Sequence, residues 1–210
     1  MTPKAVFWDM DGTLVDSEPL HDAALVSAMR SVGLEAPADL HERVLGKTAA
    51  FVYDMMRDEF GLTLPFDEWI ALKYDYYMAN VAGLQPRLGA IEIYQELRAL
   101  GVPQAVVSNS DRLIVDANLG AVGLSHAGMK TVSRNDVREG KPHPEPFLRA
   151  AWLFDVAPGE AVAIDDSVTG AMSGLAAGMK TIFWPERPMP GPDGAVVIDT
   201  EDELRAQLGL

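Results

Sequence analysis

Short apolar runs in this chain end at polar residues that could together bind a phosphate group and a metal ion. A carboxylate pair follows the first run, a hydroxyl and an amide follow a second, and two adjacent carboxylates follow a third. A lysine between glycine and proline precedes that third run. These residues are Asp9 and Asp11, Ser108 and Asn109, Asp165 and Asp166, and Lys141. In an open α/β sheet ligands bind beyond the carboxyl ends of the strands, so we expect these side chains to form one site.

The segment Asp9-Met10-Asp11-Gly12 has the residue types for phosphoryl transfer through a covalent intermediate. The Asp9 carboxylate can attack phosphorus, and Asp11 can act as general acid for the leaving oxygen. Because the carboxylate and the phosphate repel each other, a hard cation such as Mg²⁺ is needed to bridge them. The alternative is a plain turn, since Asp and Gly are common turn residues. The apolar strand before the segment favours the catalytic interpretation.

The other polar residues each have a functional and a structural interpretation. Ser108 and Asn109 can donate hydrogen bonds to phosphate oxygens, or serve as a turn or helix cap. Lys141 can pair with a phosphate or remain a solvated surface charge. Asp165 and Asp166 can bind a metal, or cap the helix that follows them. Their order along the chain and their strand context favour one shared site.

Strands and helices alternate along most of the chain. Strands are expected at 4–8, 104–108, 131–133, 161–164, 180–184 and 195–198, with helices at 90–100, 111–120, 144–154, 167–177 and 201–208. Residues 17–84 carry helical patterns only, including 39–46, 48–60 and 66–80. This predicts an α/β fold, a Rossmann-like doubly wound parallel sheet with an inserted all-helical cap. We assign residues 1–16 and 86–210 to the catalytic core and 17–85 to the cap.

The composition excludes several classes of protein. The 210 residues include no cysteine, which excludes disulfides and thiolate chemistry. A net charge of −14 argues against a nucleic-acid partner. No apolar run approaches the ~20 residues that span a membrane, and the first residues do not resemble a secretory signal. We therefore expect a cytoplasmic protein without a membrane partner.

Four ordered motifs resemble those of the haloacid dehalogenase superfamily. They are Asp9 to Glu18, Ser108-Asn109-Ser110, Gly140-Lys141-Pro142, and Asp165-Asp166-Ser167 with Gly170 and Ala177-Gly178-Met179. The chain is most similar to the branch with a helical cap after the first strand, which includes β-phosphoglucomutase and small sugar-phosphate phosphatases. The resemblance covers nearly the whole chain.

The resemblance implies roles for the acidic residues. Asp9 would be the nucleophile that becomes an aspartyl-phosphate, and Asp11 the acid/base, with its backbone carbonyl on Mg²⁺. Asp165 and Asp166 would complete the metal shell. The dehalogenases lack the second aspartate of the first motif, so Asp11 favours phosphoryl transfer.

The resemblance also implies residues that hold the substrate. Those expected to hold the phosphate are Ser108, Asn109 and Lys141. In the cap, His21 and Lys73 resemble residues that position the acid/base in β-phosphoglucomutase, although both could be ordinary surface residues. Lys47 falls in the segment that resembles the mutase specificity loop. The mutase arginine of that loop aligns with Ala49.

The predicted function is Mg²⁺-dependent hydrolysis of a small phosphorylated metabolite, such as a sugar phosphate, by a monomer or weak dimer. A phosphosugar mutase is the alternative. It needs a contact for a second phosphate, which Ala49 does not provide and Lys47 could. A third hypothesis, a non-catalytic phosphate-binding protein, is disfavoured because every motif residue is present.

Overall fold

The computed structural model describes residues 3–44 and 47–210, which divide into two compact units. The core unit comprises the chain up to Asp16 together with Gln85–Leu210, and the helical unit comprises Ser17–Leu84. Two short antiparallel strands, β2 (Val15–Asp16) and β3 (Gln85–Pro86), lie where the chain leaves and re-enters the core. Gln85, which the sequence pattern placed in the insert, pairs with Asp16 and so belongs to the core.

The core unit contains a parallel six-stranded sheet in the order β5-β4-β1-β6-β7-β8. The strands are β1 (Ala5–Trp8), β4 (Gln104–Val107), β5 (Lys130–Val132), β6 (Ala161–Asp165), β7 (Lys180–Phe183) and β8 (Val196–Val197). Numbered along the chain without the β2–β3 pair, this order is 3-2-1-4-5-6, that of a doubly wound sheet. The predicted α/β fold is confirmed. The order reverses between β1 and β6, where such sheets bind ligands.

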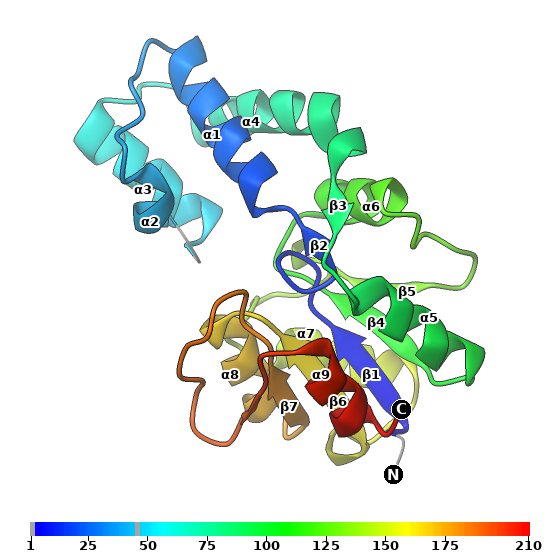
Figure 1. Cartoon of the computed structure of the whole chain (residues 1–210). Coiled ribbons are helices and arrows are strands. Elements are labelled where there is room, and N and C mark those ends of the chain that lie inside the picture. The colour runs from blue at the N-terminus through cyan, green and yellow to red at the C-terminus, as the bar shows by residue number, and fades with distance from the viewer. Residues whose placement is uncertain (1–2, 45–46) are drawn as a thin grey trace. The chain divides into compact units, whose positions relative to one another are not determined.

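Helices cover both faces of this sheet. They are α5 (Ala90–Ala99), α6 (Arg112–Ala121), α7 (Glu145–Leu153), α8 (Val168–Ala176) and α9 (Glu201–Leu208), with 3₁₀ turns at Arg134–Asp136 and Pro158–Glu160. Within the core unit, α7 and α8 lie on one face of the sheet and α5 and α9 on the other (Figure 1).

Successive side chains of a strand point to opposite faces of the sheet. Because helices cover both faces, all four side chains of β1 are buried, which explains why they are all apolar. Phe7 packs in a cluster that includes Phe147 of α7. On the opposite face the Trp8 ring lies 6.2 Å from the Tyr94 ring of α5. Trp8 Nε1 donates to Gln104 Oε1 at 2.9 Å, and Gln104 Nε2 donates to the Tyr94 carbonyl at 3.0 Å, so these buried polar groups are paired.

The helical unit packs around its own core. Its helices are α1 (Glu18–Ser31), α2 (Leu40–Val44), α3 (Ala49–Phe60) and α4 (Phe66–Asn80), followed by a 3₁₀ turn at Val81–Gly83. Met29, Met56 and Trp69 are fully buried in this core. The last two residues of the helix expected at 39–46 lie outside the described residues. Within the described ranges, no helix is long and apolar enough to cross a membrane.

Helix α8 packs directly on the sheet at Gly174, which has no side chain. A Cβ built at Gly174 would lie 2.7 Å from Thr181 Oγ1 and 2.8 Å from the Ala163 Cβ. Both distances are shorter than a normal contact, so a larger residue would force the helix away from β6 and β7.

We expect Gly174→Ala to lower the free energy of unfolding by about 1–3 kcal/mol through this overpacking. The matched control is Gly120→Ala in α6, where an added Cβ would meet nothing within 4 Å. There the same change should raise stability by up to about 1 kcal/mol, because alanine favours the helix. Urea denaturation of both variants measures the two effects, and equal effects would contradict the packing argument.

Candidate active site

Three carboxylates meet at the carboxyl ends of β1 and β6. Asp9 follows β1, Asp165 ends β6, and Asp166 is the next residue, and their oxygens lie within 4.8 Å of one another. The Asp9 amide donates to the Ile164 carbonyl at 2.8 Å, which continues the strand pairing and fixes Asp9 beside β6. Asp9 is 8% exposed and Asp165 is fully buried. The sheet topology therefore brings together residues that are more than half the chain apart.

Lys141 reaches this cluster from the loop that precedes α7. Its Nζ donates to Asp9 Oδ1 at 2.5 Å and to Asp165 Oδ2 at 2.7 Å. Burial alone would lower the pKa of Lys141, but the carboxylates of Asp165 and Asp9 outweigh burial and raise it. Lys141 therefore stays charged, and the surface-charge alternative does not describe this residue, which is 6% exposed.

Asn109 holds the backbone of Lys141. Its Oδ1 accepts from the Lys141 amide at 2.8 Å, and its Nδ2 donates to the Lys141 carbonyl at 3.1 Å. A Cβ at Gly140 would lie 2.6 Å from Asn109 Oδ1, so glycine leaves room for this pairing. Asn109 therefore holds the backbone of Lys141 in place. Its contact with a substrate phosphate remains a prediction.

The two adjacent aspartates have different surroundings. Asp165 Oδ1 accepts from the Ser167 amide at 2.9 Å and from its hydroxyl at 2.8 Å, while Oδ2 accepts from Lys141. A Cβ at Gly170 would overlap the Asp165 carboxylate, so α8 must carry glycine there. Asp166 accepts at Oδ1 from the Thr13 hydroxyl at 2.8 Å. Asp165 is therefore tied to Lys141 and to the start of α8, and Asp166 is tied to the loop after Asp9.

This loop turns sharply at Gly12, whose φ is +81°. A Cβ at Gly12 would lie 2.4 Å from Asp166 Oδ2, so both the backbone conformation and the space require glycine. Arg87 fixes the same turn from the other side, since its Nη1 donates to the Gly12 carbonyl at 2.8 Å and to the Trp184 carbonyl at 2.7 Å. The Arg87 guanidinium also stacks on Trp184, 3.8 Å from the ring centroid. In the sequence, nothing marks Arg87 beyond its place in a linker.

The Asp11 carboxylate is held by three side chains from the segment after β4. Its Oδ2 accepts from the Ser110 hydroxyl at 2.7 Å and the Ser108 hydroxyl at 3.3 Å, and its Oδ1 accepts from Asn118 Nδ2 at 3.1 Å. Ser110 lies in the Ser-Asn-Ser motif, but the motif by itself assigns it no role. Asn118 is not predicted from the sequence, where its one signal is that it is a polar residue on the apolar face of α6.

The cluster holds more negative charge than its lysine balances. Burial raises the pKa of Asp9, and Asp165, Asp166 and Asp11 raise it further, while Lys141 opposes the shift. Burial also raises the pKa of Asp166 to about 7, with repulsion from Asp165 as the next cause. Oxygen donors in a cluster with excess negative charge are the ligands that a hard divalent cation prefers. These carboxylates could hold a metal ion, beside a nucleophile and an ammonium.

The predicted cap residues lie in the helical unit. The His21 ring lies 4.6 Å from the Tyr77 ring, and Lys47 Nζ lies 5.2 Å from the Phe51 ring centroid. Burial lowers the pKa of Lys73. Their roles toward a substrate remain predictions.

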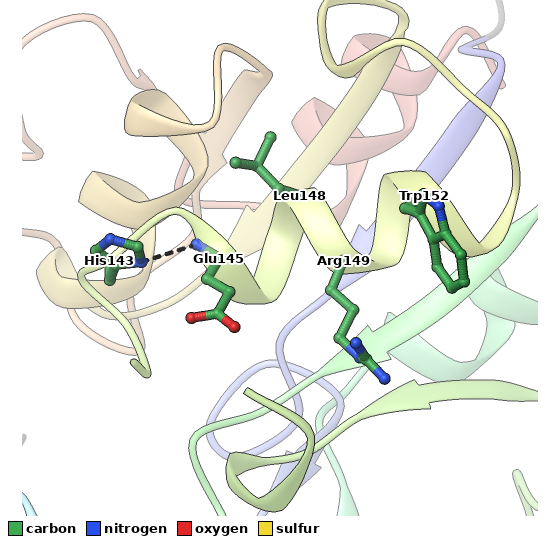
Figure 2. A pocket seen from close by; sticks show the side chains of 5 residues that line it. All are labelled: His143, Glu145, Leu148, Arg149 and Trp152. Carbon is green, nitrogen blue, oxygen red and sulfur yellow. Dashed lines mark hydrogen bonds between the residues drawn. The ribbon is translucent and has the colours of Figure 1, made fainter. Parts of the chain in front are cut away.

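A surface pocket on α7 shares no residue with the carboxylate cluster. Figure 2 shows its lining, which includes His143, Arg149 and Trp152. The Trp152 side chain is 74% exposed, and the His143 ring accepts a hydrogen bond from the Glu145 amide at 3.2 Å. We place the chemistry at the three carboxylates, since Glu145 is the one acidic side chain among the described residues that line this pocket and its oxygens accept from the Arg138 and Glu139 amides.

Comparisons with known proteins agree with the motifs. A family model for haloacid dehalogenase-like hydrolases matches residues 3–178. The chain is 33% identical to the 6-phosphogluconate phosphatase of Escherichia coli over 90% of this chain and 86% of that protein. It is 31% identical to hexitol phosphatase A of the same organism, over 87% and 83%. The structure of CbbY from Rhodobacter sphaeroides in complex with phosphate has the same fold, with a TM-score of 0.88, 24% identity and coverage of 99% and 100%. The resemblance predicted from the motifs is confirmed.

We expect Lys141→Met to lower the free energy of unfolding by about 3–5 kcal/mol, because it leaves two buried carboxylates without their partner. The loss should be larger at pH 8 than at pH 5, since unpaired carboxylates have raised pKa values and can be neutralised by protons at low pH. Lys4→Met is the control, because the Lys4–Glu160 pair at 2.6 Å is exposed and contributes about 0–1 kcal/mol. Denaturation in urea at both pH values tests this, and a loss no larger than that of Lys4→Met would refute it.

We expect Mg²⁺ to raise the melting temperature of the metal-free protein. At a Mg²⁺ concentration 100 times Kd, binding should raise the free energy of unfolding by about 2.7 kcal/mol. Asp166→Asn should remove this shift. In EDTA near pH 8 that variant should be no less stable than the parent, because the raised pKa of Asp166 means that its ionised form destabilises the fold. Asp116→Asn, on the exposed side of α6, should keep the shift. Thermal melts with and without Mg²⁺ measure it, and an unchanged Tm in the parent protein would exclude the metal site.

Proposed function

Because the chain belongs to the haloacid dehalogenase-like hydrolase family, we propose that it is a phosphoric monoester hydrolase acting on a small sugar phosphate or a related polyol or sugar-acid phosphate. The observation that carries this proposal is the buried Asp9 carboxylate beside Lys141, Asp165 and Asp166 at the reversal point of the sheet. The named relatives support the substrate class, since one acts on 6-phosphogluconate and another on hexitol phosphates, as their names state.

The donor set fits Mg²⁺, which prefers a few carboxylates together with substrate phosphate oxygens and water. Asp9 and Asp166, with the backbone carbonyl of Asp11, would hold the ion. Asp165 would contribute mainly through Lys141 and Ser167, to which its oxygens are already bonded. When bound, the ion would offset the charge on the phosphoryl oxygens.

The chain's own residues would perform two successive displacements at phosphorus. An oxygen of Asp9 attacks phosphorus, the bond to the substrate oxygen breaks, and Asp11 gives its proton to that oxygen. Water then attacks the aspartyl-phosphate while Asp11 takes up the proton, which releases phosphate and restores Asp9. Lys141 and Ser108 would stabilise the charge on the phosphoryl oxygens throughout.

Substrate selection would lie with the helical unit, and His21, Lys47 and Lys73 are the candidate residues.

The test is phosphate release from a panel of 6-phosphogluconate, sorbitol 6-phosphate, glucose 6-phosphate and p-nitrophenyl phosphate with Mg²⁺. We expect release from at least one sugar or polyol phosphate, loss of release in EDTA, and a fall of kcat by about a thousandfold or more in Asp9→Asn. Asp116→Asn should keep the parent rate.

Two results would contradict the proposal. Substantial turnover by the Asp9→Asn variant would exclude Asp9 as the nucleophile. If β-glucose 1-phosphate with a bisphosphate activator gave glucose 6-phosphate and little free phosphate, the protein would be a mutase.

A further inference from the structure

Asn118 is a buried polar residue that reaches the acid/base candidate from a distant part of the chain. It is fully buried on α6, on the same apolar face as Val115 and Leu119. An amide on such a face destabilises the fold unless it is hydrogen-bonded. Asn118 Nδ2 donates to Asp11 Oδ1 at 3.1 Å, across 107 positions in the sequence. A hydrogen bond to a carboxylate is stronger than one between neutral groups, so this contact accounts for the amide at this position.

Ser110 completes the support on the other oxygen of the same carboxylate. Its hydroxyl donates to Asp11 Oδ2 at 2.7 Å, with the Ser108 hydroxyl at 3.3 Å from the same atom. The Ser108 hydroxyl in turn accepts from the Ser110 amide at 2.9 Å, which fixes the two serines relative to each other. Both oxygens of Asp11 are therefore set in place by the β4–α6 segment.

We propose that Asn118, with Ser110, is a positioning residue that aims the Asp11 carboxyl group at the leaving oxygen of the substrate. This inference rests on the proposed function, in which Asp11 is the general acid. An acid must lie within hydrogen-bond reach of the atom it protonates, and small displacements of reacting groups slow a reaction strongly. A carboxyl group on a loop has two free side-chain torsions, and bonds to both of its oxygens restrict them.

The donor types also distinguish the two oxygens of Asp11. The Asn118 Nδ2 group can donate but not accept, so it keeps Oδ1 as an acceptor in either protonation state. The serine hydroxyls near Oδ2 can donate or accept. Oδ2 therefore lies among hydroxyls that can turn to donate or to accept, whereas the Asn118 amide nitrogen holds Oδ1 as an acceptor.

The test compares substrates that differ in their need for an acid. Sorbitol 6-phosphate loses an alkoxide, which must be protonated, whereas p-nitrophenyl phosphate loses a phenolate that is stable without a proton. The quantity measured is kcat/KM, which covers only the steps up to departure of the leaving group. Both substrates are assayed on the same preparation, so the fraction of folded enzyme cancels in the ratio of the two values.

We expect Asn118→Leu to lower kcat/KM for sorbitol 6-phosphate by about tenfold or more, and for p-nitrophenyl phosphate by less than about threefold. Asn118→Ser provides the same comparison if the leucine variant folds poorly, and Ser110→Ala should show the same pattern more weakly. The Asp11→Asn variant shows how far the losses of kcat/KM on the two substrates differ when the acid itself is removed. The control is Asn135→Ala, because Asn135 Oδ1 accepts from the Arg112 amide at 2.7 Å and so supports α6 without contacting Asp11. It should leave the substrate ratio unchanged.

The outcomes separate this inference from the proposed function. Equal losses on both substrates in the Asn118 variants, with a selective loss in Asp11→Asn, would make Asn118 purely structural and overturn the positioning role alone. An Asp11→Asn variant that loses both substrates equally would overturn the acid role of Asp11 and the inference with it. If the parent protein turns over 6-phosphogluconate or glucose 6-phosphate instead, that substrate takes the place of sorbitol 6-phosphate, since each also loses an alkoxide. If the parent protein releases phosphate from no substrate of the panel, the proposed function fails first.

Discussion

The ammonium group of Lys141, held between the buried carboxylates of Asp9 and Asp165, is the interaction on which the site depends. Buried charges are costly unless they are paired and hydrogen-bonded. A carboxylate can therefore be placed at the end of the central strand only because this cation reaches it from a different loop. One ammonium does not balance the whole cluster, which also includes Asp166. A further cation could offset the remaining negative charge, and its binding would then stabilise the fold.

Crowding of carboxylates also decides where the backbone must be glycine. Gly12 adopts a left-handed conformation against Asp166, and Gly170 lies against Asp165. Gly140 leaves room for the Asn109 amide that holds Lys141. In each case the absent side chain makes space for a charged group or its support. The glycines near the motifs thus have steric reasons that are specific to the site.

The site residues fall into those placed for chemistry and those that hold them. Asn109 pairs with the backbone of Lys141, Arg87 ties the Gly12 turn to the end of β7, and Asn118 reaches Asp11. Each contact joins the loop of one strand to a different segment of the core unit. Preorganised charges cost no reorganisation during reaction, so in the proposed mechanism these supports would be part of what the fold contributes to catalysis.

The sequence by itself determined the residue types, their order and the strands that carry them. Apolar runs that end at Asp9 and Asp165 report local structure, and parallel strands bring their carboxyl ends to one edge, so the α/β fold and the carboxylate cluster were predictable. The roles of individual site residues are still to be tested. The tertiary structure alone decided which groups support them, because Asn109, Arg87 and Asn118 reach partners 32, 75 and 107 positions away. Periodicity and motif spacing carry no information on such contacts, which arise only when separate loops pack together.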